Sequence, residues 1–243
     1  MTLKWAALAS YLLMIIINVL ASTIGINGKT TGEISNQLHV LFTPAGYVFS
    51  IWIVIYVLLG IWLLLQLFSK TVISESAIIS LVTSTCLYNI AWLLCWHYEY
   101  FALSIVMMLG LLISLIFIYS SYPKGDYRFA GRLPFSIYLS WISVALMANI
   151  SFVLTYYQWE GFGISAVWWA NLLLFVATCL AIYIRYVEVD IFFPIVIIWA
   201  FIGIAVQNGV DAGSLFYMPI LYSVVLVLWI FIGKRRSQSV TRK

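Results

Sequence analysis

Eight runs of mostly apolar residues constrain this chain more than any other feature of its sequence. Each run is long enough to cross the hydrocarbon core of a membrane, for which a helix needs about 20 residues. Only 8% of the residues are charged, against roughly 25% in soluble domains. The sequence therefore predicts an all-α, polytopic transmembrane helical bundle. The predicted spans are residues 5–27, 45–68, 77–96, 101–121, 134–156, 166–185, 190–208 and 215–233.

The basic residues predict how these spans are oriented. With a cytoplasmic N-terminus, the eight spans place eleven of the 12 Lys and Arg residues inside and only Lys29 outside. Because Lys and Arg are enriched in cytoplasmic loops, we expect a cell-membrane protein with both termini in the cytoplasm. Residues 1–27 also resemble a secretory signal peptide, but the apolar run is long for one, so we expect a first span. The residues counted as inside are Lys4, Lys70, Lys124, Arg128, Arg132, Arg185, Lys234, Arg235, Arg236, Arg242 and Lys243.

Few side chains in the predicted spans could carry out acid–base or metal chemistry. Asp, Glu, Lys and Arg are absent from the span centres, and no carboxylate pair or Ser-His-Asp set is evident. The three Cys and two His residues lack the spacing of metal ligands. We predict no metal site and no catalytic residues. The sequence leaves open whether the protein is an enzyme, but the lack of acid–base residues argues against it.

Three spans instead carry aromatic and amide side chains at helical spacing. Positions i, i+3, i+7 and i+11 fall within roughly 80° of arc on a helix, so each span has one narrow stripe. Amides facing lipid tails are costly, whereas amides facing other helices are stabilised by hydrogen bonds. The stripes comprise Phe49, Trp52, Tyr56 and Gly60; Asn89, Trp92 and Trp96; and Tyr138, Trp141, Ala145 and Asn149.

These stripes allow two interpretations, an aromatic-lined pocket or a solid core. A pocket of this kind suits a flat apolar ligand, because aromatic faces stack on rings and a few polar groups fix the edges. Trp96, Tyr98 and Tyr100 are also typical of a membrane boundary, where Trp and Tyr are enriched. The predicted ligand-binding residues are Phe49, Trp52, Tyr56, Asn89, Trp92, Tyr138, Trp141, Ala145 and Asn149.

The same stretches resemble three helices of the TspO/MBR family of tryptophan-rich sensory or translocator proteins. "FTPAGYVFSIWIVIYVLLGIW" is similar to the family pattern W-x-P-P-x-W-x-F-x-x-x-W-x-x-L-Y-x-x-M-G of the second helix. "NIAWLLCW" resembles N-x-x-W of the third helix, and "LPFSIYLSWISVALMAN" resembles P-x-x-x-Y-x-x-W-x-x-x-A-x-x-x-N of the fifth. The order of the three motifs is that of the family.

The chain departs from the family pattern in two respects. Phe42 stands where the family usually has Trp, and Ala45 replaces the second Pro. The family core has five helices, so we divide the chain into a TspO/MBR-like membrane core at 1–157, three additional transmembrane helices at 158–233 and a basic cytoplasmic tail at 234–243. This organisation resembles an extended bacterial form of the family.

The resemblance implies a pocket between helices that is capped by the first inter-helix loop, with Phe42 and Pro44 in the lid. It also implies porphyrins such as protoporphyrin IX or haem as ligands rather than resident cofactors, with an isoprenoid as another option. The partners implied are the lipid bilayer, a hydrophobic small molecule and a second copy in a homodimer, with no nucleic acid. A carrier for a neutral lipophilic metabolite and a ligand-free accessory membrane subunit remain alternatives to a receptor.

Overall fold

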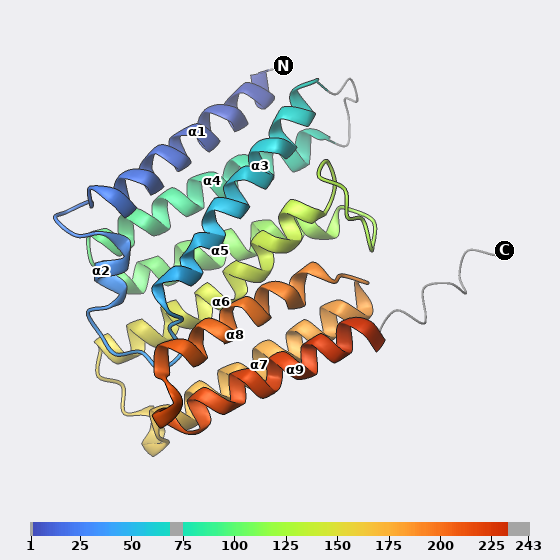
Figure 1. Cartoon of the computed structure of the whole chain (residues 1–243). Helices are drawn as coiled ribbons and strands as arrows, with labels where there is room; N and C mark the ends of the chain where they lie inside the picture. Colours follow the sequence, from blue (N-terminus) through green and yellow to red (C-terminus); the bar gives the residue numbers. More distant parts are fainter. Residues whose placement is uncertain (1, 69–74, 233–243) are drawn as a thin grey trace. The chain divides into compact units, whose positions relative to one another are not determined.

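The computed structural model describes residues 2–68 and 75–232, and these ranges form helices and no β-strand (Figure 1). An all-α fold is therefore confirmed for the described residues. The elements are α1 (Thr2–Thr23), α2 (Thr31–Ser35), η1 (Gly46–Ser50), α3 (Ile51–Phe68), α4 (Glu75–His97), α5 (Phe101–Ser120), α6 (Leu133–Tyr156), η2 (Gly161–Gly163), α7 (Ala166–Val187), α8 (Phe192–Asn208), η3 (Val210–Ala212) and α9 (Ser214–Ile232).

Seven of the described helical segments are long and apolar enough to cross a membrane. The remaining predicted span, residues 190–208, is helix α8, which is apolar but only 17 residues long. Asp190 fixes its start, because its Oδ1 accepts hydrogen bonds from the backbone N–H groups of Phe192 (2.9 Å) and Phe193 (3.2 Å). Its end is set by Gly209, whose φ of 74° leaves the helical region. At 1.5 Å per residue, α8 is about 25 Å long, near the lower limit for a span.

The chain folds into two compact units. The first unit contains residues up to 39 and residues 51–158, and it holds α1 to α6. In this unit α4 packs against α1 and α5, while α3 and α5 both pack against α6 (Figure 1). Gly60 of α3 allows close approach of α1, because a Cβ there would collide with the Tyr11 phenol, which donates to the Tyr56 carbonyl (2.8 Å).

The second unit combines residues 40–50 with the described residues from 159 onward. Helices α7, α8 and α9 pack on one another, and the short η1 segment packs on α8. The backbone of residues 40–50 is held by hydrogen bonds to and from α8, a feature that the sequence did not indicate. Ala45 N donates to Gly203 O (3.0 Å), Trp199 Nε1 donates to Val48 O (3.1 Å), and Asn208 Nδ2 donates to Leu41 O (3.0 Å).

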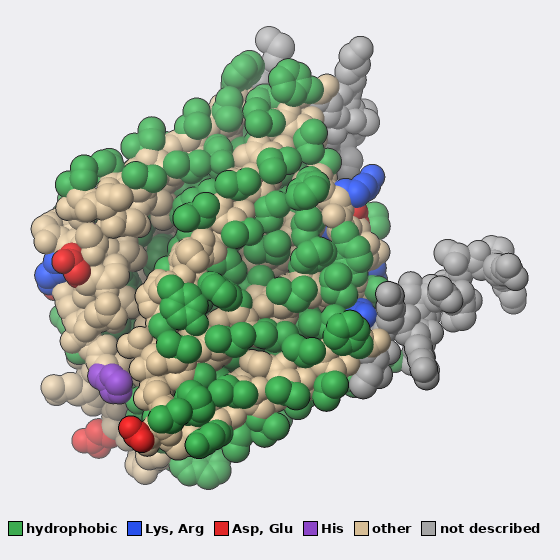
Figure 2. Space-filling view, in the orientation of Figure 1, with side chains coloured by type: hydrophobic (Ala, Val, Ile, Leu, Met, Phe, Trp, Pro, Cys, Tyr) green, Lys and Arg blue, Asp and Glu red, His purple; other side chains and the backbone are tan. Residues whose placement is uncertain are grey.

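The outer faces of the helices are apolar. Figure 2 shows hydrophobic side chains over the helices of the face in view, whereas the charged and histidine side chains visible there lie at the edges. Large side chains such as Ile53 and Phe175 are more than half exposed. Because a water-facing surface would be rich in charge, these faces indicate contact with lipid tails. The structure thus describes a multi-pass membrane protein.

Candidate ligand site in the aromatic stack

Four near-parallel rings from α3 and α4 form a continuous column, which we call the aromatic stack. It consists of Tyr56, Trp52, Trp92 and Trp96, in that order. Adjacent ring centroids are 5.6, 6.3 and 6.2 Å apart, with interplanar angles of 24°, 26° and 27°. Offset stacking at these separations is favourable for aromatic pairs. The register read from the sequence therefore brings Trp52, Tyr56 and Trp92 together.

Two rings from α6 close one side of the stack. Tyr138 and Trp141 both meet Trp52 edge-on, with centroids 5.9 and 6.1 Å away and interplanar angles of 75° and 86°. Both side chains are 1% exposed. Edge-on contacts of this kind are favourable for aromatic pairs and help to hold the Trp52 ring in its orientation.

Several donors of the stack are buried without a hydrogen-bond partner. Among the described residues, no acceptor lies within reach of Tyr56 Oη, Trp92 Nε1 or Trp96 Nε1. A buried polar group left in this state costs about 1–3 kcal/mol. The stack therefore combines flat apolar faces with donors that favour an acceptor from elsewhere.

A network of amide hydrogen bonds is joined to the stack through Tyr138, which contacts Trp52. Asn89 Oδ1 accepts from Asn18 Nδ2 of α1 (2.8 Å), and Asn89 Nδ2 donates to Tyr138 Oη of α6 (3.2 Å). These bonds join three helices through one side chain that is fully buried. Asn18 was not among the residues predicted for the site, because a lone amide on one helix gives no pairing signal.

The remaining stripe residues of α6 lie in different surroundings. The two polar atoms of the Asn149 amide both pair with Ser104 Oγ of α5, at 3.1 and 3.2 Å, so Asn149 joins two helices. Ala145 is partly exposed. Trp96 lies in the last turn of α4, as expected for a boundary residue, but it is only 5% exposed, and its ring centroid lies 4.6 Å from that of Phe152. Tyr98 and Tyr100, in contrast, are exposed.

The predicted lid residues and one predicted ligand-binding residue belong to the second unit. The lid residues Phe42 and Pro44 and the ligand-binding residue Phe49 lie in residues 40–50. Phe42 is 1% exposed, and the chain from 42 to 45 is buried throughout. The roles of these three residues in ligand binding stay predictions.

A loop of the first unit is anchored by a histidine for which the sequence suggested no role. His97 is 1% exposed at the end of α4. Its Nδ1 lies 3.0 Å from Ile26 O, which can only accept, so Nδ1 carries the hydrogen and Nε2 accepts from Thr31 Oγ1 (3.0 Å). The His97 carbonyl in turn accepts from Asn27 Nδ2 (3.1 Å). These bonds hold the α1–α2 loop against α4.

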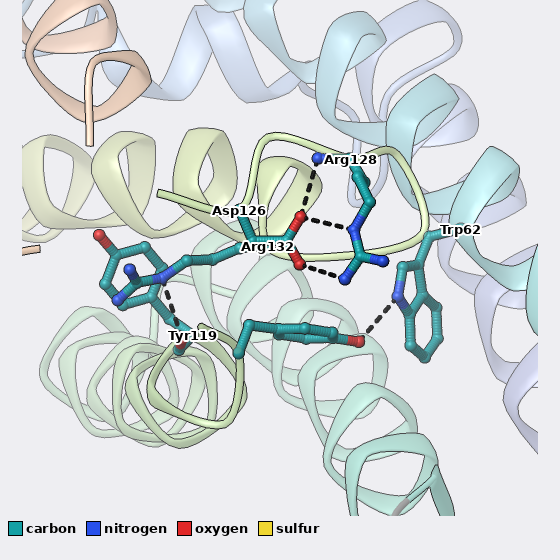
Figure 3. Close-up of polar contacts among 6 residues, drawn as sticks. Trp62, Tyr119, Asp126, Arg128 and Arg132 are labelled. Atoms are coloured by element: carbon teal, nitrogen blue, oxygen red, sulfur yellow. Dashed lines mark hydrogen bonds and ion pairs between the residues drawn. The ribbon is translucent and has the colours of Figure 1, made fainter. Parts of the chain in front are cut away.

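The α5–α6 loop carries a second polar cluster (Figure 3), and this loop lies at the end of the first unit opposite the α1–α2 loop (Figure 1). Asp126 accepts from Arg128 through both carboxylate oxygens, each at 2.9 Å. The Arg132 guanidinium lies 3.5 Å above the centre of the Tyr119 ring, and its Nε donates to the Tyr119 carbonyl (3.1 Å). Trp62 Nε1 is satisfied by Tyr122 Oη at 3.0 Å. The cluster ties the loop to the ends of α3 and α5.

The Asp126–Arg128 pair predicts a pH dependence of stability. Hydrogen bonds from the Arg128 side chain hold the pKa of Asp126 below its usual value, although partial burial acts in the opposite direction. A carboxyl group of this kind stabilises the fold above its unfolded-state pKa of about 3.9, and the contribution is lost as the pH falls through the folded-state pKa. Asp126→Asn should therefore unfold at a lower temperature than the wild type at about pH 7 and at the same temperature at about pH 2.

Thermal unfolding in detergent, measured across this pH range, checks the expectation. Asp211→Asn is the matched control, because no hydrogen-bond donor or cation pairs with the Asp211 carboxylate among the described residues. A difference between Asp126→Asn and the wild type that stays constant with pH would contradict the assignment.

The fold and the stack together define a class, a multi-pass α-helical membrane protein built around buried tryptophan and tyrosine rings. A family model described as TSPO-like protein matches residues 4–232, and the chain belongs to this family. The resemblance seen in the sequence is thereby confirmed, and the match extends through α9 rather than ending near 157. No curated protein and no solved structure matches the chain significantly. The division of the chain at 157 stays a prediction.

Proposed function

We propose that this protein is a membrane receptor that binds a flat hydrophobic ligand, with a porphyrin or related tetrapyrrole as the favoured class, at the aromatic stack. The observation that carries the proposal is the column of near-parallel rings Tyr56, Trp52, Trp92 and Trp96. A planar macrocycle gains dispersion and stacking energy against such faces, and few other ligand shapes use them as fully.

The unpartnered donors of the stack narrow the class of ligand further. Trp92 Nε1 and Trp96 Nε1 donate only, and Tyr56 Oη can donate as well. A ligand with acceptor atoms at its edge, such as the carboxylates of a porphyrin, would supply the missing partners. A purely hydrocarbon ligand would leave them unpaired, which supports a tetrapyrrole over an isoprenoid hydrocarbon at this position.

A titration tests this function. Protoporphyrin IX is added to the protein in lipid nanodiscs while tryptophan fluorescence and porphyrin absorbance are followed together. We expect saturable quenching with one plateau, because a defined site fills. Linear, non-saturable quenching that equals the signal of empty nanodiscs plus free tryptophan would contradict the proposal. Flux of the same porphyrin across liposomes containing the protein distinguishes a carrier from a receptor.

We also propose that both termini lie in the cytoplasm. Within the first unit, the cations Lys4, Lys124, Arg128 and Arg132 lie at the helix ends opposite the α1–α2 loop, where Lys29 pairs with Glu99 (2.9 Å). This distribution follows the enrichment of basic residues on the cytoplasmic side. We further propose that the protein forms a homodimer, as the family resemblance implies. Chemical crosslinking in native membranes tests this.

Reporter fusions test the orientation. Alkaline phosphatase fused after Lys243 should be inactive, and green fluorescent protein at the same position should fluoresce, because only the cytoplasm supports that pattern. Fusions in the α1–α2 loop should show the reverse pattern. An active phosphatase at the C-terminus would overturn the cytoplasmic placement of that terminus.

A further inference from the structure

The second unit contains a groove between α7 and α9, with a volume of about 640 Å³. The volume lies within the usual range of small-molecule sites, about 300–1,000 Å³. The residues that line each wall recur every four positions, so each wall is one face of a helix. From the first to the last of them is eight residues, or about 12 Å along the helix. The wall residues at this spacing are Val167, Asn171 and Phe175 of α7 and Ser214, Met218 and Tyr222 of α9.

Most of the lining is apolar and aromatic, but one end carries an amide and a hydroxyl. Trp169 contributes a ring whose polar atom is already used, because its Nε1 donates to Gly161 O (3.0 Å). Asn171 and Ser214 lie side by side at the start of their helices, joined by a hydrogen bond of 3.0 Å. The groove therefore has a polar end near the helix termini and an apolar body toward the middle of the helices.

The orientation of the Asn171 amide follows from its neighbours. Asn171 Nδ2 donates to the backbone carbonyl of Val167 (2.8 Å), an atom that can only accept, so Nδ2 and Oδ1 are not interchangeable. The other atom, Asn171 Oδ1, is buried and has no donor within reach among the described residues. Ser214 Oγ accepts from Asn171 and keeps its own hydrogen to donate. The pair thus offers one unused acceptor and one unused donor.

We propose that this groove binds a lipophilic alcohol dissolved in the bilayer. Its hydroxyl would donate to Asn171 Oδ1 and accept from Ser214 Oγ, while its apolar body lies along Phe175, Met218 and Tyr222. Because Oδ1 is buried in the structure, binding includes a local side-chain adjustment at the pair. The site uses residues of the second unit only, so it is independent of the aromatic stack.

The chemistry of the lining favours an alcohol over the other components of a membrane. No Lys, Arg, Asp or Glu lines the groove, so a charged headgroup would find no counter-charge. An acyl chain or alkane would fill the apolar body but leave Asn171 Oδ1 unpaired. Asn171 lies five residues after the start of α7 at Ala166, about 7.5 Å along the helix, so the hydroxyl would sit near the membrane boundary and the body deeper.

A pair of matched ligands tests the hydrogen bond directly. Tritiated geranylgeraniol and its methyl ether are bound to the full-length protein in nanodiscs, since the ether keeps the oxygen and the chain but lacks the hydroxyl hydrogen. We expect the alcohol to bind on the order of fivefold to tenfold more tightly than the ether, as one buried hydrogen bond provides. Asn171→Leu should abolish the difference between the two ligands.

Substitutions on one helix give the control. Ser214→Ala should weaken binding of the alcohol, whereas Ser223→Ala should not, because the Ser223 hydroxyl is bonded within α9 to Pro219 O (2.7 Å) and does not line the groove. Equal affinity of alcohol and ether for the wild type would overturn the proposal, and this readout does not depend on any variant folding. Labelling by a diazirine analogue of geranylgeraniol at α3 or α4 instead of α7 and α9 would also overturn it. Porphyrin binding is a separate readout, so either site can fail alone.

Discussion

Replacing Trp52 by alanine is expected to abolish saturable porphyrin binding at micromolar ligand. Trp52 is the ring that joins the two halves of the stack, since it contacts Tyr56 on one side and Trp92 on the other. Its removal deletes the central ring of the stack and with it the face that would stack on the macrocycle, a contact worth roughly 0.5–1.5 kcal/mol beyond area burial. The affinity should therefore fall on the order of tenfold to a hundredfold, which the shift in porphyrin absorbance during titration measures.

Three further variants separate this effect from loss of structure. Trp52→Phe keeps a ring and should bind with intermediate affinity. Trp92→Phe keeps a ring but removes the buried donor, so it should weaken a porphyrin on the order of fivefold. Trp5→Ala, on the exposed side of α1, is the control and should leave the affinity unchanged. A Trp52→Ala protein with the thermal midpoint and the porphyrin affinity of the wild type would exclude the stack as the site.

The second large effect is expected at Gly203 in α8. A Cβ at this position would collide with the Val48 side chain and come within 3.1 Å of Pro44 Cβ, and the Gly203 carbonyl accepts from Ala45 N. Gly203→Ala should therefore push residues 40–50 away from α8 and reduce the free energy of unfolding by about 1–3 kcal/mol, as overpacked cores do. Reversible unfolding in mixed detergent–SDS micelles measures the loss.

The matched control lies in the same segment. Gly46→Ala adds the same methyl group where nothing lies within 4 Å, so its stability should stay close to that of the wild type. Val48→Ala should partly rescue Gly203→Ala, because it removes the atoms that the new Cβ would meet. If Gly203→Ala and Gly46→Ala were equally stable, the close packing of residues 40–50 on α8 would be wrong.

The sequence predicted those parts of the molecule that depend on local patterns. Apolar length predicts a span without reference to the rest of the chain, and it located seven helices that are long enough to cross a membrane; it also located helix α8, which at 17 residues is shorter than these. Helical spacing likewise placed Trp52 and Tyr56 on one face of α3 and Trp92 on α4, and the structure brings all three rings together.

The sequence did not predict contacts that are made once, between residues far apart in the chain. The bonds of His97 to Ile26 and Thr31 span about 70 positions and have no periodic signal. The same holds for Asn18, whose amide pairs with Asn89 across 71 positions. Trp96 shows a third limit, since a tryptophan at a helix end is typical of a membrane boundary whether its ring faces lipid or protein. Only packing distinguishes the two cases.

The hydrogen bonds between residues 40–50 and α8 have a consequence for biosynthesis. Val48 and Trp199 are separated by 151 positions, so the donor of this bond is synthesised long after the acceptor. At about 5–20 residues per second, the delay is on the order of 10–30 s. Backbone carbonyls need partners when they lie within a membrane, so this stretch must wait in the insertion machinery or in the aqueous interface until α8 emerges. A chain truncated at residue 157 would lack those donors, so the carbonyl groups of Leu41 and Val48 at the start of its second span would lose these hydrogen bonds.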